Sequence, residues 1–149
     1  MNPNKRNLAF GLGEKCGMDE NRFKHYRLNI KEIDDEHWNL FQMLDHFEQN
    51  VRNKERIAAV SILTQFTISI REHFRKEEDL MLQHNFPFRE SHIDHHKKIE
   101  AKVTAILNAG FSYSWLLICY QLNSLLIDHI DWIDSQYADF INNLVENNK

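Results

Sequence analysis

The chain contains few of the residues that interrupt helices. Its 149 residues include only four glycines and two prolines, and long stretches contain neither. Because glycine and proline mark turns and break helices, their scarcity predicts an all-helical chain with short connections. Hydrophobic residues make up 42% of the sequence, which is enough for one sizeable core. We therefore expect residues 1–149 to form a single domain.

A long apolar run, a basic cluster and a set of cysteines are also missing. The longest apolar run, residues 115–120, is far shorter than the roughly 20 residues of a membrane span, and the polar residues 1–6 lead into no secretory signal. Eighteen basic residues against 22 acidic ones, with no basic block, argue against a nucleic-acid partner. Cys16 and Cys119 are too few and too far apart in the sequence for a disulfide framework, and they fit a reducing compartment. We expect a cytoplasmic protein that binds neither nucleic acid nor membranes.

Apolar residues recur at alternating spacings of four and three, as they do on amphipathic helices. This periodicity predicts helices at about 34–51, 55–84, 89–108 and 113–142, after an irregular N-terminal arm over residues 1–23. Asp34 or Asp35 is placed to cap the first helix, Pro87 follows the second, and the Asn-rich end from residue 142 is expected to fray. With short connections, the predicted fold is an up-down-up-down antiparallel four-helix bundle.

Histidines occupy core-facing positions on all four predicted helices. They are His37 on the first helix, His73 on the second, His92 and His96 on the third, and His129 on the fourth. A pairing of His92 with His95 remains open, although the apolar stripe favours His96. Glu77 lies one turn after His73 on the same face. A buried carboxylate without a partner costs several kcal/mol, so Glu77 requires a hydrogen-bond network, a cation or a metal.

A second carboxylate, Asp134, follows His129 by five residues. On an ideal helix that spacing places the two side chains about 140° apart, which is unfavourable for a shared ligand. They converge if the helix widens locally to an i,i+5 turn, or if Asp134 reaches in from the flank of the stripe.

Together these residues predict a metal site. A single histidine on an apolar stripe is more often a hydrogen-bonded core residue. However, antiparallel neighbours bring the start of one helix to the end of the next, so five imidazoles and two carboxylates meet at one level, which is costly without metal. Seven donors are too many for one tetrahedral zinc, whereas two five- or six-coordinate ions bridged by the carboxylates use them all. Nitrogen and oxygen donors without thiolate suit iron, manganese or zinc.

The spacing of these residues resembles the hemerythrin family, and most closely its bacterial branch, the bacteriohemerythrins. The motifs are Ile33-Asp34-Asp35-Glu36-His37, His73-Phe74-x-x-Glu77-Glu78-x-x-Met81, His92-x-x-x-His96 and His129-Ile130-x-x-x-Asp134-x-x-Tyr137. The resemblance covers about residues 23–140, and the sequence departs from the family pattern at Asn29, where a glycine is usual. It implies a four-helix bundle with a non-haem di-iron centre.

The resemblance also implies a role for each donor. His92, His96 and His129 would hold one iron ion, and His37 and His73 would hold the other, which keeps an open position. Glu77 and Asp134 would bridge the two ions beside an oxo or hydroxo group. Dioxygen would bind at the open position, be held as hydroperoxide and leave by the reverse steps, so the protein would be a dioxygen carrier or store and not an enzyme.

Two leucines are candidates for the wall of the dioxygen pocket. Leu125 and Leu126 lie one turn before His129, where many bacterial relatives have a tryptophan four residues before the histidine, although plain core packing explains both leucines equally well. Two other function classes stay open on the same seven donors. One is an oxygen, redox or nitric oxide sensor, for which the arm would contact an unidentified protein partner. The other is an enzyme acting on peroxide, nitric oxide or ferrous iron.

Overall fold

The computed structural model describes residues 15–109 and 114–148, and every regular element among them is helical. The elements are α1 (Glu20–Phe23), α2 (Lys31–Arg52), α3 (Arg56–Gln83), α4 (Arg89–Ala109), α5 (Trp115–His129), the π-helical turn η3 (Ile130–Asp134) and α6 (Ser135–Asn147). The prediction of an all-helical chain is therefore confirmed for the described residues.

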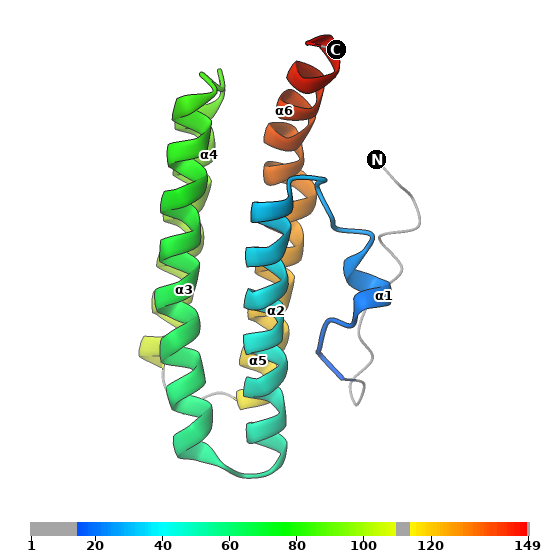
Figure 1. Cartoon of the computed structure of the whole chain (residues 1–149). Helices are drawn as coiled ribbons and strands as arrows, with labels where there is room; N and C mark the ends of the chain where they lie inside the picture. Colours follow the sequence, from blue (N-terminus) through cyan, green and yellow to red (C-terminus); the bar gives the residue numbers. More distant parts are fainter. Residues whose placement is uncertain (1–14, 110–113, 149) are drawn as a thin grey trace.

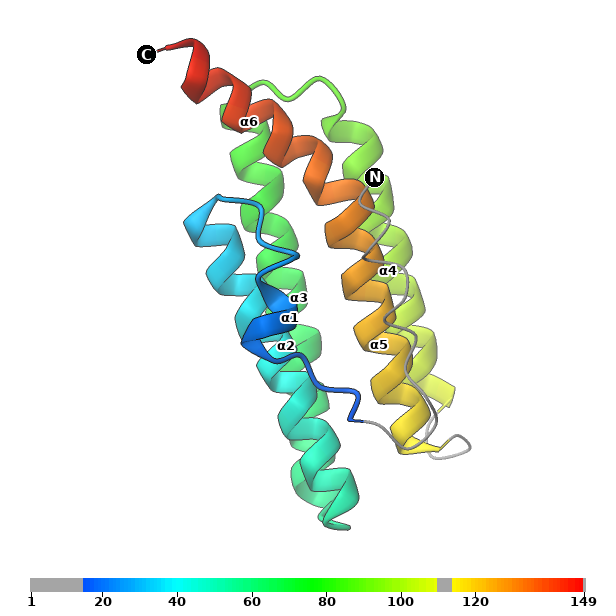
Figure 2. The ribbon, with the colours of Figure 1, turned by 90° about the vertical axis from the view of Figure 1, so that its right-hand side faces the viewer.

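The long helices pack side by side as a bundle. In Figure 1, α2 runs downward, α3 returns upward, α4 lies behind α3, and α5, η3 and α6 follow one another up the molecule. Contacts join α2 to α3 and α5, and α4 to α3 and α5, so the helices surround a common interior. Figure 2 shows the same arrangement from the side, where the last helical segments lean across the end of the bundle.

The interior contains a larger and a smaller apolar cluster. On α2, Ile33 belongs to the smaller cluster, whereas Leu40 belongs to the larger one. Along α3 the larger cluster comes first, because Ile70 belongs to the larger cluster and Met81 to the smaller. Apart from Phe74, the buried residues between these positions are polar, so a polar layer separates the two clusters.

The described part of the N-terminal arm, residues 15–23, contains one helical turn. Residues 1–14 of the predicted irregular arm lie outside the described residues. The Asp19 carboxylate caps α1 by accepting a hydrogen bond from the backbone N–H of Arg22 at 2.8 Å. Phe23 is buried, with its ring centroid 5.1 Å from that of Trp38 and 5.9 Å from that of Phe41. The arm is therefore attached to α2 (Figure 2).

The predicted cap at Asp34 or Asp35 is wrong. Helix α2 begins at Lys31 and has no side-chain cap. The Asp34 carboxylate instead accepts hydrogen bonds from the backbone N–H groups of Leu28 at 2.7 Å and Asn29 at 3.1 Å. Asn29 has φ of 61°, in the left-handed region that glycine and asparagine tolerate best. This turn directs the preceding amides toward Asp34, so the carboxylate stabilises the entry loop.

The last helix is longer than expected. Helix α6 ends at Asn147 rather than near residue 142, so the expected fraying from residue 142 is not observed. No glycine or proline interrupts this segment, and Phe140 and Ile141 pack against the smaller apolar cluster, which anchors the helix beyond the bundle.

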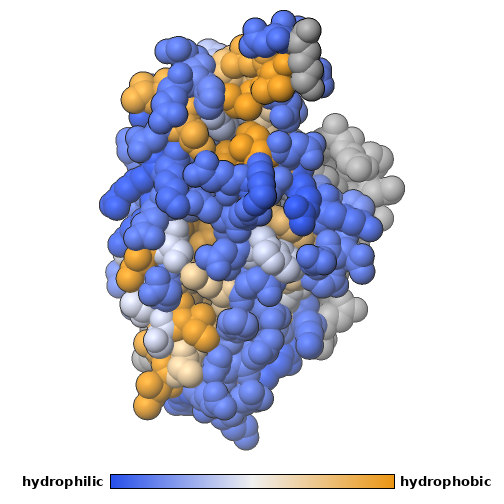
Figure 3. All heavy atoms as spheres, in the orientation of Figure 1, coloured by the Kyte–Doolittle hydropathy of each residue, from blue (hydrophilic) through white to orange (hydrophobic). Residues whose placement is uncertain are grey.

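Hydrophilic residues cover most of the face in Figure 3, and apolar residues gather toward its two ends. Within residues 15–109 and 114–148, no helix combines the length and the apolar character that a bilayer crossing requires.

Candidate metal centre

The polar layer brings together all seven side chains that the sequence singles out. They are His37, His73, Glu77, His92, His96, His129 and Asp134. None is more than 4% exposed. Helix α2 supplies His37, α3 supplies His73 and Glu77, and α4 supplies His92 and His96. Helix α5 supplies His129, and η3 supplies Asp134. Their low exposure excludes bulk water as the partner of these polar groups.

The π-helical turn resolves the unfavourable spacing between His129 and Asp134. Residues 130–134 form wider i,i+5 turns, so Asp134 lies nearly above His129 along the helix axis. The His129 Nε2 atom is 2.8 Å from Asp134 Oδ1. Of the two ways in which these side chains were expected to converge, the local widening is the one observed.

The donor atoms fall into two overlapping groups. One group contains His92, His96 and His129 with both carboxylates, and the other contains His37 and His73 with the same carboxylates. Within each group the donor atoms all lie within 4.8 Å of one another. Glu77 and Asp134 belong to both groups, so each could contribute a donor atom to both. His96 belongs to the first group, and His95 belongs to neither.

The spacing of the donor atoms fits metal coordination better than hydrogen bonding. The Asp134 oxygens lie 3.1 Å from His37 Nε2 and 3.0 Å from His92 Nε2. Yet both Asp134 oxygens and the Nε2 atoms of His92 and His129 are buried without a hydrogen bond. Donors on adjacent vertices of an octahedron with bonds of about 2.1 Å lie about 3.0 Å apart. The described donor set therefore fits two cations, each surrounded by nitrogen and oxygen.

The electrostatics of the layer keep the carboxylates ionised. Burial and the Asp134 carboxylate act to raise the pKa of Glu77, but the imidazoles of His92 and His96 outweigh them and lower this pKa to about 2. Burial likewise acts to raise the pKa of Asp134, and the imidazoles around it, chiefly His129, hold it well below its usual value. Burial acts to lower the pKa of His92, but the two carboxylates raise it to about 9. The layer thus favours ionised carboxylates beside a protonated His92.

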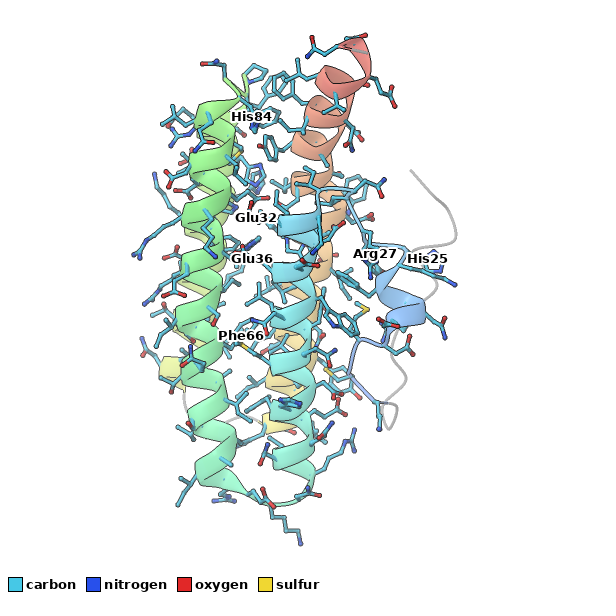
Figure 4. The ribbon with its side chains drawn as sticks, viewed as in Figure 1. His25, Arg27, Glu32, Glu36, Phe66 and His84 are labelled. Atoms are coloured by element: carbon cyan, nitrogen blue, oxygen red, sulfur yellow. The ribbon has the colours of Figure 1, made fainter. Side chains whose placement is uncertain are left out.

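Two glutamates orient the imidazoles from outside the layer. The Nδ1–H group of His73 donates to Glu36 Oε2 at 2.7 Å, and that of His96 donates to Glu78 Oε1 at 2.8 Å. In a neutral imidazole this bond leaves the lone pair on Nε2, which faces the layer. Glu36 also pairs with Lys76, and Figure 4 shows it on the side of α2 that faces α3.

Sequence reasoning missed the orienting roles of Glu36 and Glu78. A usable signal was present, because each lies next to a donor in the sequence, Glu36 before His37 and Glu78 after Glu77. A neighbour on a helix is rotated by about 100°, which places its side chain on the flank of the stripe and within reach of the adjacent helix.

Phe74 forms an apolar wall beside the layer. Its ring stacks on that of His96, with centroids 3.9 Å apart and planes 9° apart, and meets the His129 ring edge-on at 5.4 Å. Leu126 is buried in the larger apolar cluster, and Leu125 packs against it while partly buried. The structure therefore places both leucines in the core next to the turn that carries His129.

Comparison with known proteins agrees with this geometry. The model of a protein family described as "Hemerythrin HHE cation binding domain" matches residues 28–141. No curated protein and no solved structure matches the chain.

Proposed function

The chain belongs to the hemerythrin HHE cation-binding domain family, and we propose that its polar layer holds two iron ions that bind dioxygen reversibly. The observation that carries this proposal is the unequal size of the two donor groups. One group supplies five donors and the other supplies four, with Glu77 and Asp134 common to both. The four-donor group, which contains His37 and His73, leaves more of its cation's coordination sphere free for an external ligand.

Charge also supports a pair of cations. The layer contains two ionised carboxylates, and its imidazoles are neutral when they coordinate metal. Two divalent ions held there would therefore retain net positive charge, which would suit a small ligand that gains electron density. When bound, a ferrous pair would supply the electrons that reversible dioxygen binding requires.

The residues around the layer hold this arrangement and exclude water. Glu36 and Glu78 fix two of the imidazoles, so little reorganisation is needed when metal enters. Phe74 covers His96 and His129 with an apolar ring. We propose Leu125 and Leu126 as the apolar wall of the dioxygen pocket, since a dry wall slows the access of water and protons that promotes irreversible oxidation.

Three finer assignments belong to the same proposal. The first is the up-down-up-down antiparallel four-helix bundle, in which α5, η3 and α6 count as one continuous helix. All the described helices would then belong to one domain. The motifs around His73 and His129 support the bacteriohemerythrin branch. A site built for reversible binding favours a carrier or store over an enzyme.

A cycle of oxygenation tests the function. The full chain is loaded with ferrous iron without air, exposed to dioxygen and returned to inert gas, while the visible spectrum is recorded through several cycles. We expect a band that appears with dioxygen and fades on its removal. The His37→Ala chain should lose the band, whereas His46→Ala, at an exposed position on the same helix, should keep it. A single irreversible change in the unaltered chain would reject the carrier and favour sensing or peroxide chemistry.

A further inference from the structure

Two cysteines meet where the N-terminal arm crosses the bundle. Cys16 in the arm and Cys119 on α5 are 103 residues apart in the sequence, yet their Sγ atoms lie 2.8 Å apart. Both are fully buried free thiols. Their separation in the sequence suggested no pairing, so this contact is a product of how the arm folds back. It lies in the larger apolar cluster and involves none of the seven donors.

The distance distinguishes a sulfur–sulfur bond from a metal site. Glu48 lies near both thiols and completes a group of three candidate donors. Two thiolates on one tetrahedral zinc, with Zn–S bonds of about 2.3 Å, lie about 3.8 Å apart, which is much longer than the observed 2.8 Å. The Glu48 Oε1 atom is also occupied by Arg52, at 2.6 and 2.9 Å. The observed Sγ–Sγ distance is nearer to the disulfide bond length of about 2.05 Å than to the sulfur–sulfur distance in a zinc site.

The residues around the pair hold the two sulfurs together. The side-chain amide of Asn123 donates to Cys16 Sγ at 2.8 Å and to the Cys119 carbonyl at 3.0 Å. Next to Cys16, Gly17 lies against the Asp45 side chain, so the arm passes close to α2 at this point. These contacts hold the Cys16 thiol next to the Cys119 thiol.

We propose that Cys16 and Cys119 form a reversible disulfide that locks the N-terminal arm onto α5 under oxidising conditions. The oxidant is a low-molecular-weight disulfide such as oxidised glutathione. One cysteine thiolate attacks it, which forms a mixed disulfide and releases one glutathione thiolate. The second cysteine then displaces the other glutathione. Two protein thiols lose two electrons, one glutathione disulfide becomes two thiols, and the two protons pass to the released sulfurs.

Burial makes this exchange depend on opening of the arm. The close contact with the Cys16 thiol, together with burial, raises the pKa of the Cys119 thiol, so Cys119 stays protonated while the arm is closed. Local opening exposes ordinary thiols, and closure then brings them together again. The lock requires no metal, so it stands or falls independently of the proposed di-iron function.

A glutathione redox series tests the lock. The full chain is equilibrated at increasing ratios of oxidised to reduced glutathione, quenched in acid, and alkylated after denaturation. We expect a species lighter by two hydrogens that resists alkylation and yields one peptide containing both cysteines. We also expect the thermal midpoint of the oxidised chain to rise by about 5–10 °C, because the bond closes a long loop. The Cys16→Ser and Cys119→Ser chains should show neither change.

Three results would overturn the proposal. The first is that both thiols remain open to alkylation at the most oxidising ratio. The second is that glutathione adducts form without any bond between Cys16 and Cys119. The third is a zinc ion retained by the reduced chain and lost in both serine variants, which would make the cluster a metal site. The measurement on the unaltered chain does not depend on whether the variants fold.

Discussion

Replacement of Glu78 by alanine should weaken metal binding although Glu78 is not one of the seven donors. Its Oε1 atom accepts the Nδ1–H of His96 at 2.8 Å, while the Nε2 atom of that ring lies 3.1 Å from Glu77 Oε2 inside the layer. Without Glu78 the ring loses its fixed orientation. Loss of such an outer partner costs about 10- to 100-fold in metal affinity, or about 1.4–2.7 kcal/mol. Because the Glu78 side chain is 24% exposed, water partly replaces it, so we expect about 10-fold.

Anaerobic competition against a coloured ferrous chelator measures this loss. The Glu78→Gln chain keeps an oxygen that can accept the imidazole N–H, so it should recover part of the affinity. Glu72→Ala is the matched control, since Glu72 lies exposed on the same helix. Glu78 has no orienting role if Glu78→Ala loses no more metal affinity than Glu72→Ala, or if glutamine at position 78 restores none of the lost affinity.

Three further predictions concern the metal, one donor and the thiols. Metal at 100 times its dissociation constant should stabilise the chain by about 2.7 kcal/mol per site, so a chelator should lower the thermal midpoint measured by calorimetry by about 5–10 °C or more. Asp134→Asn should reduce the metal count of the loaded chain while circular dichroism stays helical, and Asp139→Asn, at an exposed position, should leave the count unchanged. The pKa of Cys119 is raised in the folded chain, so as the pH rises the unfolded chain loses the thiol proton first. The free energy of unfolding of the reduced protein should therefore fall as the pH rises from 8 to 10, by up to about 1.4 kcal/mol per pH unit. Denaturant unfolding of Cys119→Ser should lack this part of the slope.

The polar layer could be predicted because burial and helical periodicity are encoded locally. Each of the seven side chains lies on an apolar stripe or one widened turn from it, and a histidine or carboxylate at such a position needs a partner. The family resemblance supplied the roles that periodicity alone leaves open. The i,i+5 spacing of His129 and Asp134 was itself informative, because a regular helix cannot bring the two together and the observed π-helical turn does.

The features that were missed depend on contacts between distant segments. Glu36 reaches His73 across a helix interface, and Cys16 reaches Cys119 through a fold of the arm, so neither contact follows from local periodicity. The start of α2 was misplaced because Asp34 resembles a helix cap in sequence. Its carboxylate is used instead by the amides of the preceding loop, whose path depends on the left-handed conformation of Asn29.

Counting the iron in the anaerobically loaded chain shows whether the seven buried side chains hold two iron ions. The full chain is loaded with excess ferrous iron, freed of unbound metal by gel filtration, and analysed for iron and protein. We expect about two iron ions per chain, and a clear loss when Glu77 or Asp134, the two shared donors, is replaced by its amide. One ion or none in the unaltered chain, or two ions retained in both amide variants, would contradict it.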